Sequence, residues 1–123
     1  MSHTKKQPLY KSFKHAFEGI FNTIKKERNI KIHLCMMCLV ILCGFYFHIT
    51  KLEWMICLIL FALVISLELV NTAIEAVVDL ASPDIHPLAK ISKDAAAGAV
   101  LISAIIAAII GLMIFIPYLL KMV

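Results

Sequence analysis

Residues 68–79 have the sequence ELVNTAIEAVVD, and the polar residues in this stretch constrain how the rest of the chain can fold. It holds four polar residues at intervals of three, four and four: Glu68, Asn71, Glu75 and Asp79. This spacing places them on one stripe of an α-helix, whereas nearly all residues between them are apolar. A carboxylate costs a few kcal/mol to hold in hydrocarbon, so the stripe has to face a partner, a metal or water.

Two interpretations of this polar stripe are open. It can be a seam that holds helices together, or a set of oxygens that serves a metal and a general base in a protein-lined pocket. Interhelical seams in membranes favour Ser, Thr and Asn, which cost less to bury than the two glutamates here. An ionisable residue inside the membrane indicates function by default, and we favour the second interpretation.

The composition indicates a small integral membrane protein. The chain has 123 residues, of which 62% are hydrophobic, and its mean hydropathy of +0.93 excludes an ordinary soluble domain of this size. Eight of its twelve Lys and Arg residues lie within residues 5–31. A basic end beside apolar spans favours contact with anionic lipid head groups or phosphate, and we expect no nucleic-acid partner. The first thirty residues lack the apolar core of a signal peptide.

From the N-terminus to the C-terminus, the sequence predicts an all-α membrane domain over residues 1–123. Apolar residues at helical spacing in region 1–29 predict an amphipathic helix in the membrane interface, or a soluble helix packed on the cytoplasmic end of the bundle. Uncharged or nearly uncharged runs predict transmembrane helices at 30–50, 52–80 and 94–120.

Three local features complete this prediction. The segment from Ser82 to Lys93 contains two prolines and is predicted to be a loop, with Asp94 in the first turn of the next helix. Pro117 is predicted to end or bend the last helix. We interpret Cys35 and Cys38, a C-x-x-C pair without a second pair, as buried inert thiols.

The placement of Lys and Arg predicts the orientation of a multi-pass protein. The N-terminal segment and the segment 82–93 hold most of these residues, so we expect both to be cytoplasmic and the C-terminus to lie outside. The polar stripe then ends on the side where ATP is available. Three thin helices cannot wall off several charges alone, so we also expect an oligomer.

The residue types of the stripe favour magnesium and phosphate chemistry. The sequence contains no GxxxxGK[ST] phosphate loop, and the HExxH pattern of zinc peptidases is absent. Carboxylates supply the hard oxygen ligands that Mg²⁺ takes, and lysines supply positive charge to phosphate.

Two stretches carry a resemblance to a known family. ELVNTAIEAVVD at 68–79 and AKISKDAAAGAV at 89–100 resemble the signature of the prokaryotic diacylglycerol kinase family. The resemblance extends from about Lys11 to the end of the chain, and residues 27–29, His33 and the HPLAK stretch at 86–90 resemble its Gram-positive branch of undecaprenol kinases. It implies a homotrimer with three spans and an N-terminal surface helix. It also implies transfer of the γ-phosphate of ATP to a lipid alcohol with Mg²⁺.

The resemblance also implies roles for individual residues. Glu68 would be the general base that takes the proton of the lipid hydroxyl, and Asn71 would orient the base or the substrate. Glu27 and Glu75 would hold Mg²⁺. Four further residues would lie against the nucleotide: Asp84, His86, Lys93 and Asp94.

The predicted substrate class rests on one difference between this sequence and the diacylglycerol-specific branch of the family. An acidic residue on the first span of the diacylglycerol-specific branch corresponds here to His33, which favours undecaprenol as the substrate and diacylglycerol as the alternative. The product would be undecaprenyl phosphate, the carrier lipid of cell-wall assembly, made in a bacterial cell membrane. A proton-coupled exporter that uses Glu68 is an alternative of another class, but an exporter has no need of Lys90, Lys93 and Asp94. A structural scaffold would not explain the polar stripe.

Overall fold

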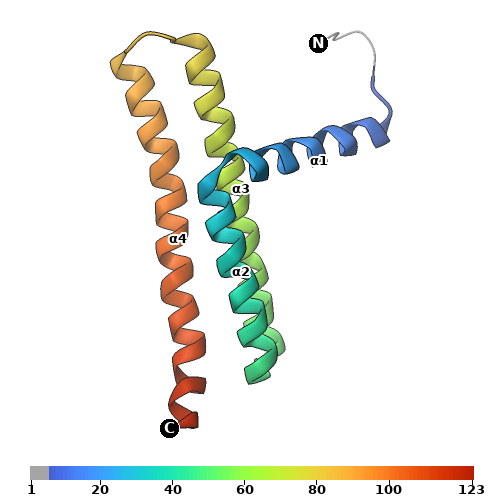
Figure 1. Cartoon of the computed structure of the whole chain (residues 1–123), viewed down its shortest axis with the longest axis vertical. Coiled ribbons are helices and arrows are strands. Elements are labelled where there is room, and N and C mark those ends of the chain that lie inside the picture. The colour runs from blue at the N-terminus through green and yellow to red at the C-terminus, as the bar shows by residue number, and fades with distance from the viewer. Residues whose placement is uncertain (1–5) are drawn as a thin grey trace.

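Four helices of different lengths make up the protein, in a computed structural model that describes residues 6–123. They are α1 (Leu9–Lys26), α2 (Arg28–Phe47), α3 (Lys51–Ala81) and α4 (Pro87–Met122). Figure 1 shows that α2, α3 and α4 run along the long axis of the molecule, whereas α1 lies across it. α3 and α4 form an antiparallel pair with extensive contacts, and α2 packs against α3.

Three of these helices are long and apolar enough to cross a membrane. The most apolar windows of α2, α3 and α4 have mean hydropathies of 2.1, 2.3 and 3.0. The predicted all-α fold, with three helices long and apolar enough to span a membrane, is therefore confirmed. Most of the large apolar side chains are exposed in the single chain, as lipid-facing surfaces require.

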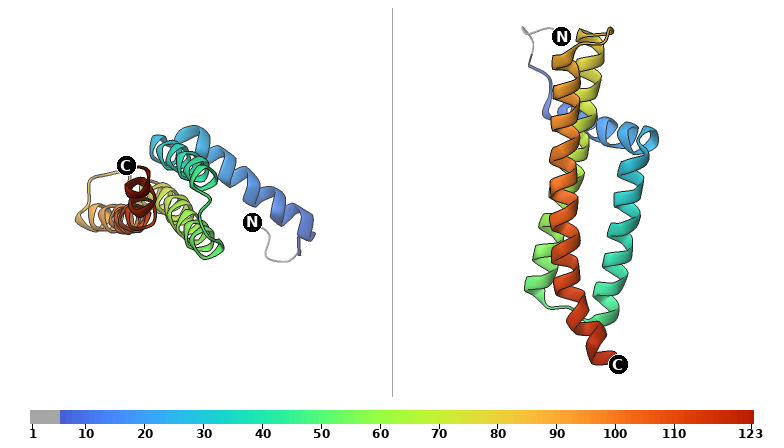
Figure 2. Two further views of the ribbon diagram at one scale, coloured as in Figure 1. Left: turned by 90° about the horizontal axis from the view of Figure 1, so that it is seen from below. Right: turned by 90° about the vertical axis from the view of Figure 1, so that its left-hand side faces the viewer.

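The helix lengths indicate where the membrane boundary falls. With 20 residues, α2 is about 30 Å long, which matches the hydrocarbon core of a bilayer. With 31 and 36 residues, α3 and α4 are about 46 Å and 54 Å long, so they exceed that thickness. Most of their excess length lies beyond the α1–α2 junction, at the end where the short connection between α3 and α4 is found, and the C-terminal end of α4 also extends past the other end of α2 (Figures 1 and 2). The last turns of α3 and the first turns of α4 thus extend past the level at which α2 begins.

The connection between α2 and α3 is built from local capping interactions. His48 adopts the left-handed conformation that ends α2, with φ of 52°. Thr50 and Glu53 form a capping box, in which each side chain accepts a hydrogen bond from the backbone N–H of the other. The hydroxyl of Tyr118 on α4 also donates to Glu53, which ties the end of α4 to this connection.

The predicted loop from Ser82 to Lys93 is too long, because α4 begins at Pro87. Proline fits the first turn of a helix since it has no N–H to leave unpaired there, and the Nδ1 atom of His86 accepts a hydrogen bond from the N–H of Leu88 at 3.1 Å. Between α3 and α4 only residues 82–86 lie outside a helix. Asp94 therefore lies in the second turn of α4 rather than the first.

Two other local predictions are also corrected by the structure. α4 does not end at Pro117 but continues to Met122, so the predicted helix end at this proline is wrong, whereas the alternative of a bend is not contradicted. Cys35 and Cys38 are exposed on the surface of α2 rather than buried. On a helix that crosses a membrane such a surface faces lipid or another protein chain, which suits a weakly polar thiol.

Gly44 allows α2 and α3 to pack closely near this connection. A Cβ atom at position 44 would lie 2.5 Å from the indole ring of Trp54. We expect Gly44→Ala to destabilise the fold by about 1–3 kcal/mol through overpacking, measured as a lower melting temperature in detergent micelles. Gly111→Ala is the matched control, because nothing lies within 4 Å of its added Cβ and alanine favours a helix. An unchanged melting temperature for Gly44→Ala would show that Trp54 can move aside without cost.

Candidate active site

A cavity of about 310 Å³ lies between α2, α3 and α4, near the end at which α2 begins. Apolar or small side chains form most of its wall, and α3 contributes Glu68 and Asn71 from the polar stripe. The lining residues are Asn29, Ile32, His33, Glu68, Asn71, Ala97, Val100, Leu101 and Ala104. A pocket with an apolar wall and a few converging polar groups is the usual form of a small-molecule site.

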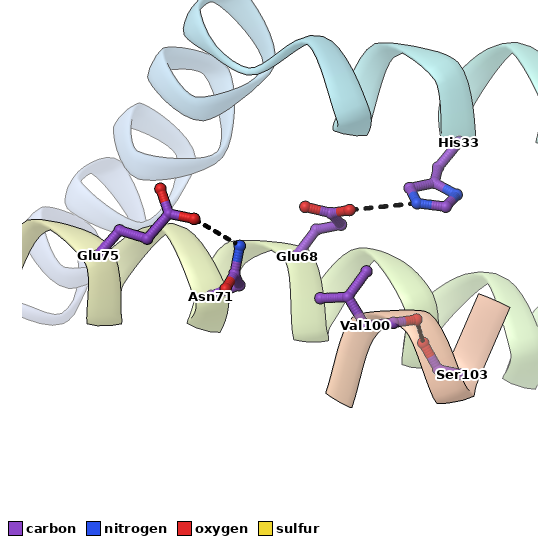
Figure 3. Close-up of polar contacts among 6 residues, drawn as sticks. All are labelled: His33, Glu68, Asn71, Glu75, Val100 and Ser103. Carbon is purple, nitrogen blue, oxygen red and sulfur yellow. Dashed lines mark hydrogen bonds and ion pairs between the residues drawn. The ribbon is translucent and has the colours of Figure 1, made fainter. Parts of the chain in front are cut away.

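Glu68 is the buried carboxylate of this cavity, with 3% of its surface exposed. Its Oε1 atom lies 3.1 Å from Nε2 of His33, which is on α2. Figure 3 shows that the other carboxylate oxygen of Glu68 points away from His33, to the side of Asn71 and Glu75. Glu68 therefore has one oxygen held by the protein and one turned along the polar stripe.

Asn71 and Glu75 form the next part of the stripe. The Nδ2 atom of Asn71 donates to Oε1 of Glu75 at 3.0 Å, and this fixes the orientation of the amide because a carboxylate only accepts. The Oδ1 atom of Asn71 is then buried without a hydrogen-bond partner, the one such side-chain atom in the described chain. A buried acceptor without a donor is costly, so a bound donor group would relieve it.

The outer part of the stripe is held by α4. The Nζ atom of Lys93 lies 2.5 Å from Oδ1 of Asp79. Lys90 makes a hydrogen bond of 2.5 Å to Asp94 on the same helix. The excess length of α3 and α4 thus carries both acids and lysines, next to the cavity.

A family model described as prokaryotic diacylglycerol kinase matches residues 14–115 of the chain. The chain belongs to the prokaryotic diacylglycerol kinase family. The predicted family, and with it a lipid kinase, is confirmed, and we do not retain the exporter and scaffold interpretations.

The members of this family that the chain resembles differ in the substrates they are named for. An undecaprenol kinase of Bacillus subtilis is 52% identical over 109 residues, which cover 89% of this chain and 89% of the relative. A diacylglycerol kinase of Synechocystis is 40% identical over 115 residues, which cover 93% of this chain and 66% of the relative. A diacylglycerol kinase of Haemophilus influenzae is 30% identical over 109 residues, which cover 87% of this chain and 92% of the relative.

The structure does not bring every predicted site residue of this kinase to the cavity. Glu27 lies at the junction of α1 and α2, which passes beside α3, and it is half-buried. Asp84 and His86 are exposed in the connection between α3 and α4. The backbone oxygen of Asp84 accepts a hydrogen bond from Ser82, and the side chain of His86 caps α4. Both contacts serve the local fold.

The donor set of this kinase suits Mg²⁺ only if the substrate supplies further oxygens. Residues 6–123 contain no cluster of three or more His, Cys, Asp or Glu side chains that would hold a metal alone. Mg²⁺ usually keeps several waters and takes one or two carboxylates together with substrate phosphates. Glu75 fits such a site, because Asn71 fixes one of its oxygens and the second points away from that contact (Figure 3).

His33 is the main site residue whose place the sequence analysis did not predict. On sequence alone it was a residue of the first predicted span and an indicator of the family branch, whereas in the structure it contacts Glu68 in the cavity. Its four-residue spacing from Asn29 was the available signal, since both residues then lie on one face of α2 and both line the cavity.

Proposed function

We propose that this kinase transfers the γ-phosphate of ATP to the hydroxyl of undecaprenol in a bacterial cell membrane. The products are undecaprenyl phosphate and ADP, and Mg²⁺ is the metal. The observation that carries the proposal is a buried carboxylate, Glu68, in an apolar cavity beside an exposed group of acids and lysines. The identity of 52% with a protein named undecaprenol kinase supports the polyprenol over diacylglycerol.

The proposed placement in the membrane follows from the helix lengths. α2 spans the hydrocarbon, α1 lies in the cytoplasmic interface, and the ends of α3 and α4 project into the cytoplasm. The exposed apolar residues of α1 that would enter the lipid are Leu9, Tyr10, Phe13, Phe17 and Phe21. The cavity then opens near the membrane surface, where the hydroxyl of a long-chain alcohol resides while its chain stays in lipid.

In the proposed reaction Glu68 takes the proton of the lipid hydroxyl. The lipid oxygen forms a bond to the γ-phosphorus, the bond from this phosphorus to the ADP oxygen breaks, and the proton ends on Glu68. Glu68 and Glu75 are seven residues apart, about 10 Å along the helix axis, which leaves room for the hydroxyl and the phosphoryl group between them. Asn71 lies between the two glutamates, and its unpaired Oδ1 accepts a hydrogen bond from the bound substrate or an ordered water.

The remaining site residues bind the nucleotide and the metal in this proposal. Glu27 and Glu75 would hold Mg²⁺, which neutralises charge on the phosphate oxygens when bound. Lys93 supplies a positive charge to the phosphates, and its contact with Asp79 keeps the ammonium group on this side of α4. Asp84, His86 and Asp94 line the nucleotide-binding site.

A homotrimer is the proposed assembly. α2 and α4 both line the cavity but pack against α3 rather than closely against each other, so the single chain does not seal the cavity between them. Neighbouring copies would close the cavity to lipid and cover part of the exposed apolar surface of α2 and α4. Chemical crosslinking of the purified protein in detergent is expected to give a trimer as the largest main species.

A substrate panel tests the proposed function. The purified protein in detergent with Mg²⁺ and labelled ATP is given undecaprenol or diacylglycerol at matched mole fractions. We expect at least tenfold faster phosphorylation of undecaprenol. Faster turnover of diacylglycerol would reverse the substrate choice within the same family, and no transfer to either lipid would refute the proposed reaction.

A further inference from the structure

His33 lines the cavity from a different helix than the proposed base. α4 contributes only uncharged residues to the wall: Ala97, Val100, Leu101 and Ala104. α3 contributes Glu68 and Asn71, and α2 adds Asn29 next to His33. Among the lining residues His33 is therefore the one side chain that can carry a positive charge, and it contacts the one that can carry a negative charge.

The contact with His33 gives the two carboxylate oxygens of Glu68 different roles. Nε2 of His33 lies 3.1 Å from Oε1 of Glu68, and this is the one ion pair of Glu68 within the described chain. The second oxygen points away from the imidazole (Figure 3). A carboxylate with one oxygen held has a restricted orientation, and an oxygen that is not held is available to a substrate.

The contact between His33 and Glu68 is important because both side chains are largely shielded from water. Glu68 is 3% exposed and the side chain of His33 is 22% exposed, so little water reaches the carboxylate. A buried carboxylate without a polar partner is costly, so the imidazole at 3.1 Å helps to hold Glu68 in this position.

We propose that His33 is a positioning residue for Glu68. It holds Oε1 and leaves the second oxygen facing the lipid hydroxyl. The inference rests on the proposed function, because it gives His33 a task only if Glu68 is the base. His33 touches neither the nucleotide nor the metal ligands in this proposal.

Two substitutions at position 33 test the proposal in the full-length kinase. His33→Gln keeps an N–H donor of similar reach, whereas His33→Leu removes the donor and keeps an apolar side chain. We expect kcat for undecaprenol to fall about 100-fold in His33→Leu and less than tenfold in His33→Gln, since small displacements of a catalytic group cost about this much. The KM for Mg·ATP is expected to stay within twofold in both. His15→Leu, at an exposed histidine on α1, is the control and is expected to keep the wild-type kcat.

A double-mutant cycle separates positioning from a general effect on the shape of the cavity. In the Glu68→Gln background, His33→Leu is expected to change the residual rate less than twofold, because the base that it positions is already absent. A further loss of about 100-fold in that background would overturn the proposal, since two independent effects multiply. Equal losses in His33→Gln and His33→Leu would also overturn it, because glutamine retains the donor.

The outcomes distinguish this inference from the proposed function. If Glu68→Gln retains wild-type turnover, the proposed base is wrong and the proposed reaction needs another one. If Glu68→Gln is inactive but His33→Leu turns over like the wild type, only the role of His33 is refuted.

Discussion

Glu68→Gln is expected to lower the turnover of undecaprenol by about 10²–10⁴-fold, the usual contribution of a general base. The amide has nearly the same shape as the carboxylate, but it does not accept the proton that the lipid hydroxyl releases. The proposed nucleotide contacts lie outside the cavity, on α4 and in the connection that precedes it, so the affinity for ATP is expected to change less than threefold. Phosphoryl transfer is measured with labelled ATP, and nucleotide affinity is measured separately by equilibrium binding.

Folding serves as the internal check on this variant. Glutamine has nearly the same shape as glutamate and can remain next to His33, so the melting temperature in detergent should stay close to that of the wild type. Glu18→Gln is the matched control because Glu18 is exposed on α1, and its turnover should stay within twofold. Wild-type turnover in Glu68→Gln, with a folded protein, would remove Glu68 from the role of base.

The helices of this protein could be predicted from the sequence because each one has a strong local pattern. The apolar runs of α2 and α3 are interrupted by charges at Lys51 and Glu53, so their approximate bounds follow directly. The start of α4 was misplaced by seven residues because two prolines were taken as signals of a loop. Pro87 instead occupies the first turn of the helix, where a proline removes no helical hydrogen bond.

The polar stripe was predictable, but the contacts of its members were not. Their intervals of three and four require only that α3 is a helix, and the hydrogen bond from Asn71 to Glu75 is such a local contact. The contact of Glu68 with His33 joins residues 35 positions apart, and it depends on how α2 packs along α3. The contact of Lys93 with Asp79 likewise depends on the pairing of α3 with α4. Periodicity within one helix does not contain this information.

The predicted ligands of the nucleotide show a related limit. Asp84 and His86 were assigned by their motif positions, and the structure places both in an exposed connection in which His86 caps α4. The cap made by His86 depends only on local backbone geometry, so it does not prevent His86 from also contacting a bound nucleotide.

Glu75→Gln is expected to raise the Mg²⁺ concentration needed for half-maximal turnover by at least tenfold. A carboxylate attracts the cation through its charge, whereas the neutral amide offers one weaker oxygen and keeps the hydrogen bond to Asn71. Turnover is measured against Mg²⁺ concentration at a fixed saturating ATP concentration. At saturating Mg²⁺ the turnover should recover most of the wild-type value, because Glu68 and Lys93 are untouched.

A binding measurement separates a metal ligand from a residue that only shapes the site. Ligands that bind the folded state raise its stability, so ATP with Mg²⁺ should raise the melting temperature of the wild type more than ATP alone. In Glu75→Gln this additional rise is expected only at about tenfold higher Mg²⁺, whereas Glu18→Gln should follow the wild type. The carboxylate of Glu75 would have no part in metal binding if both the turnover curve and the melting curve of Glu75→Gln overlaid the wild-type curves. The proposed metal site would then have to be built on Glu27 and the substrate phosphates alone.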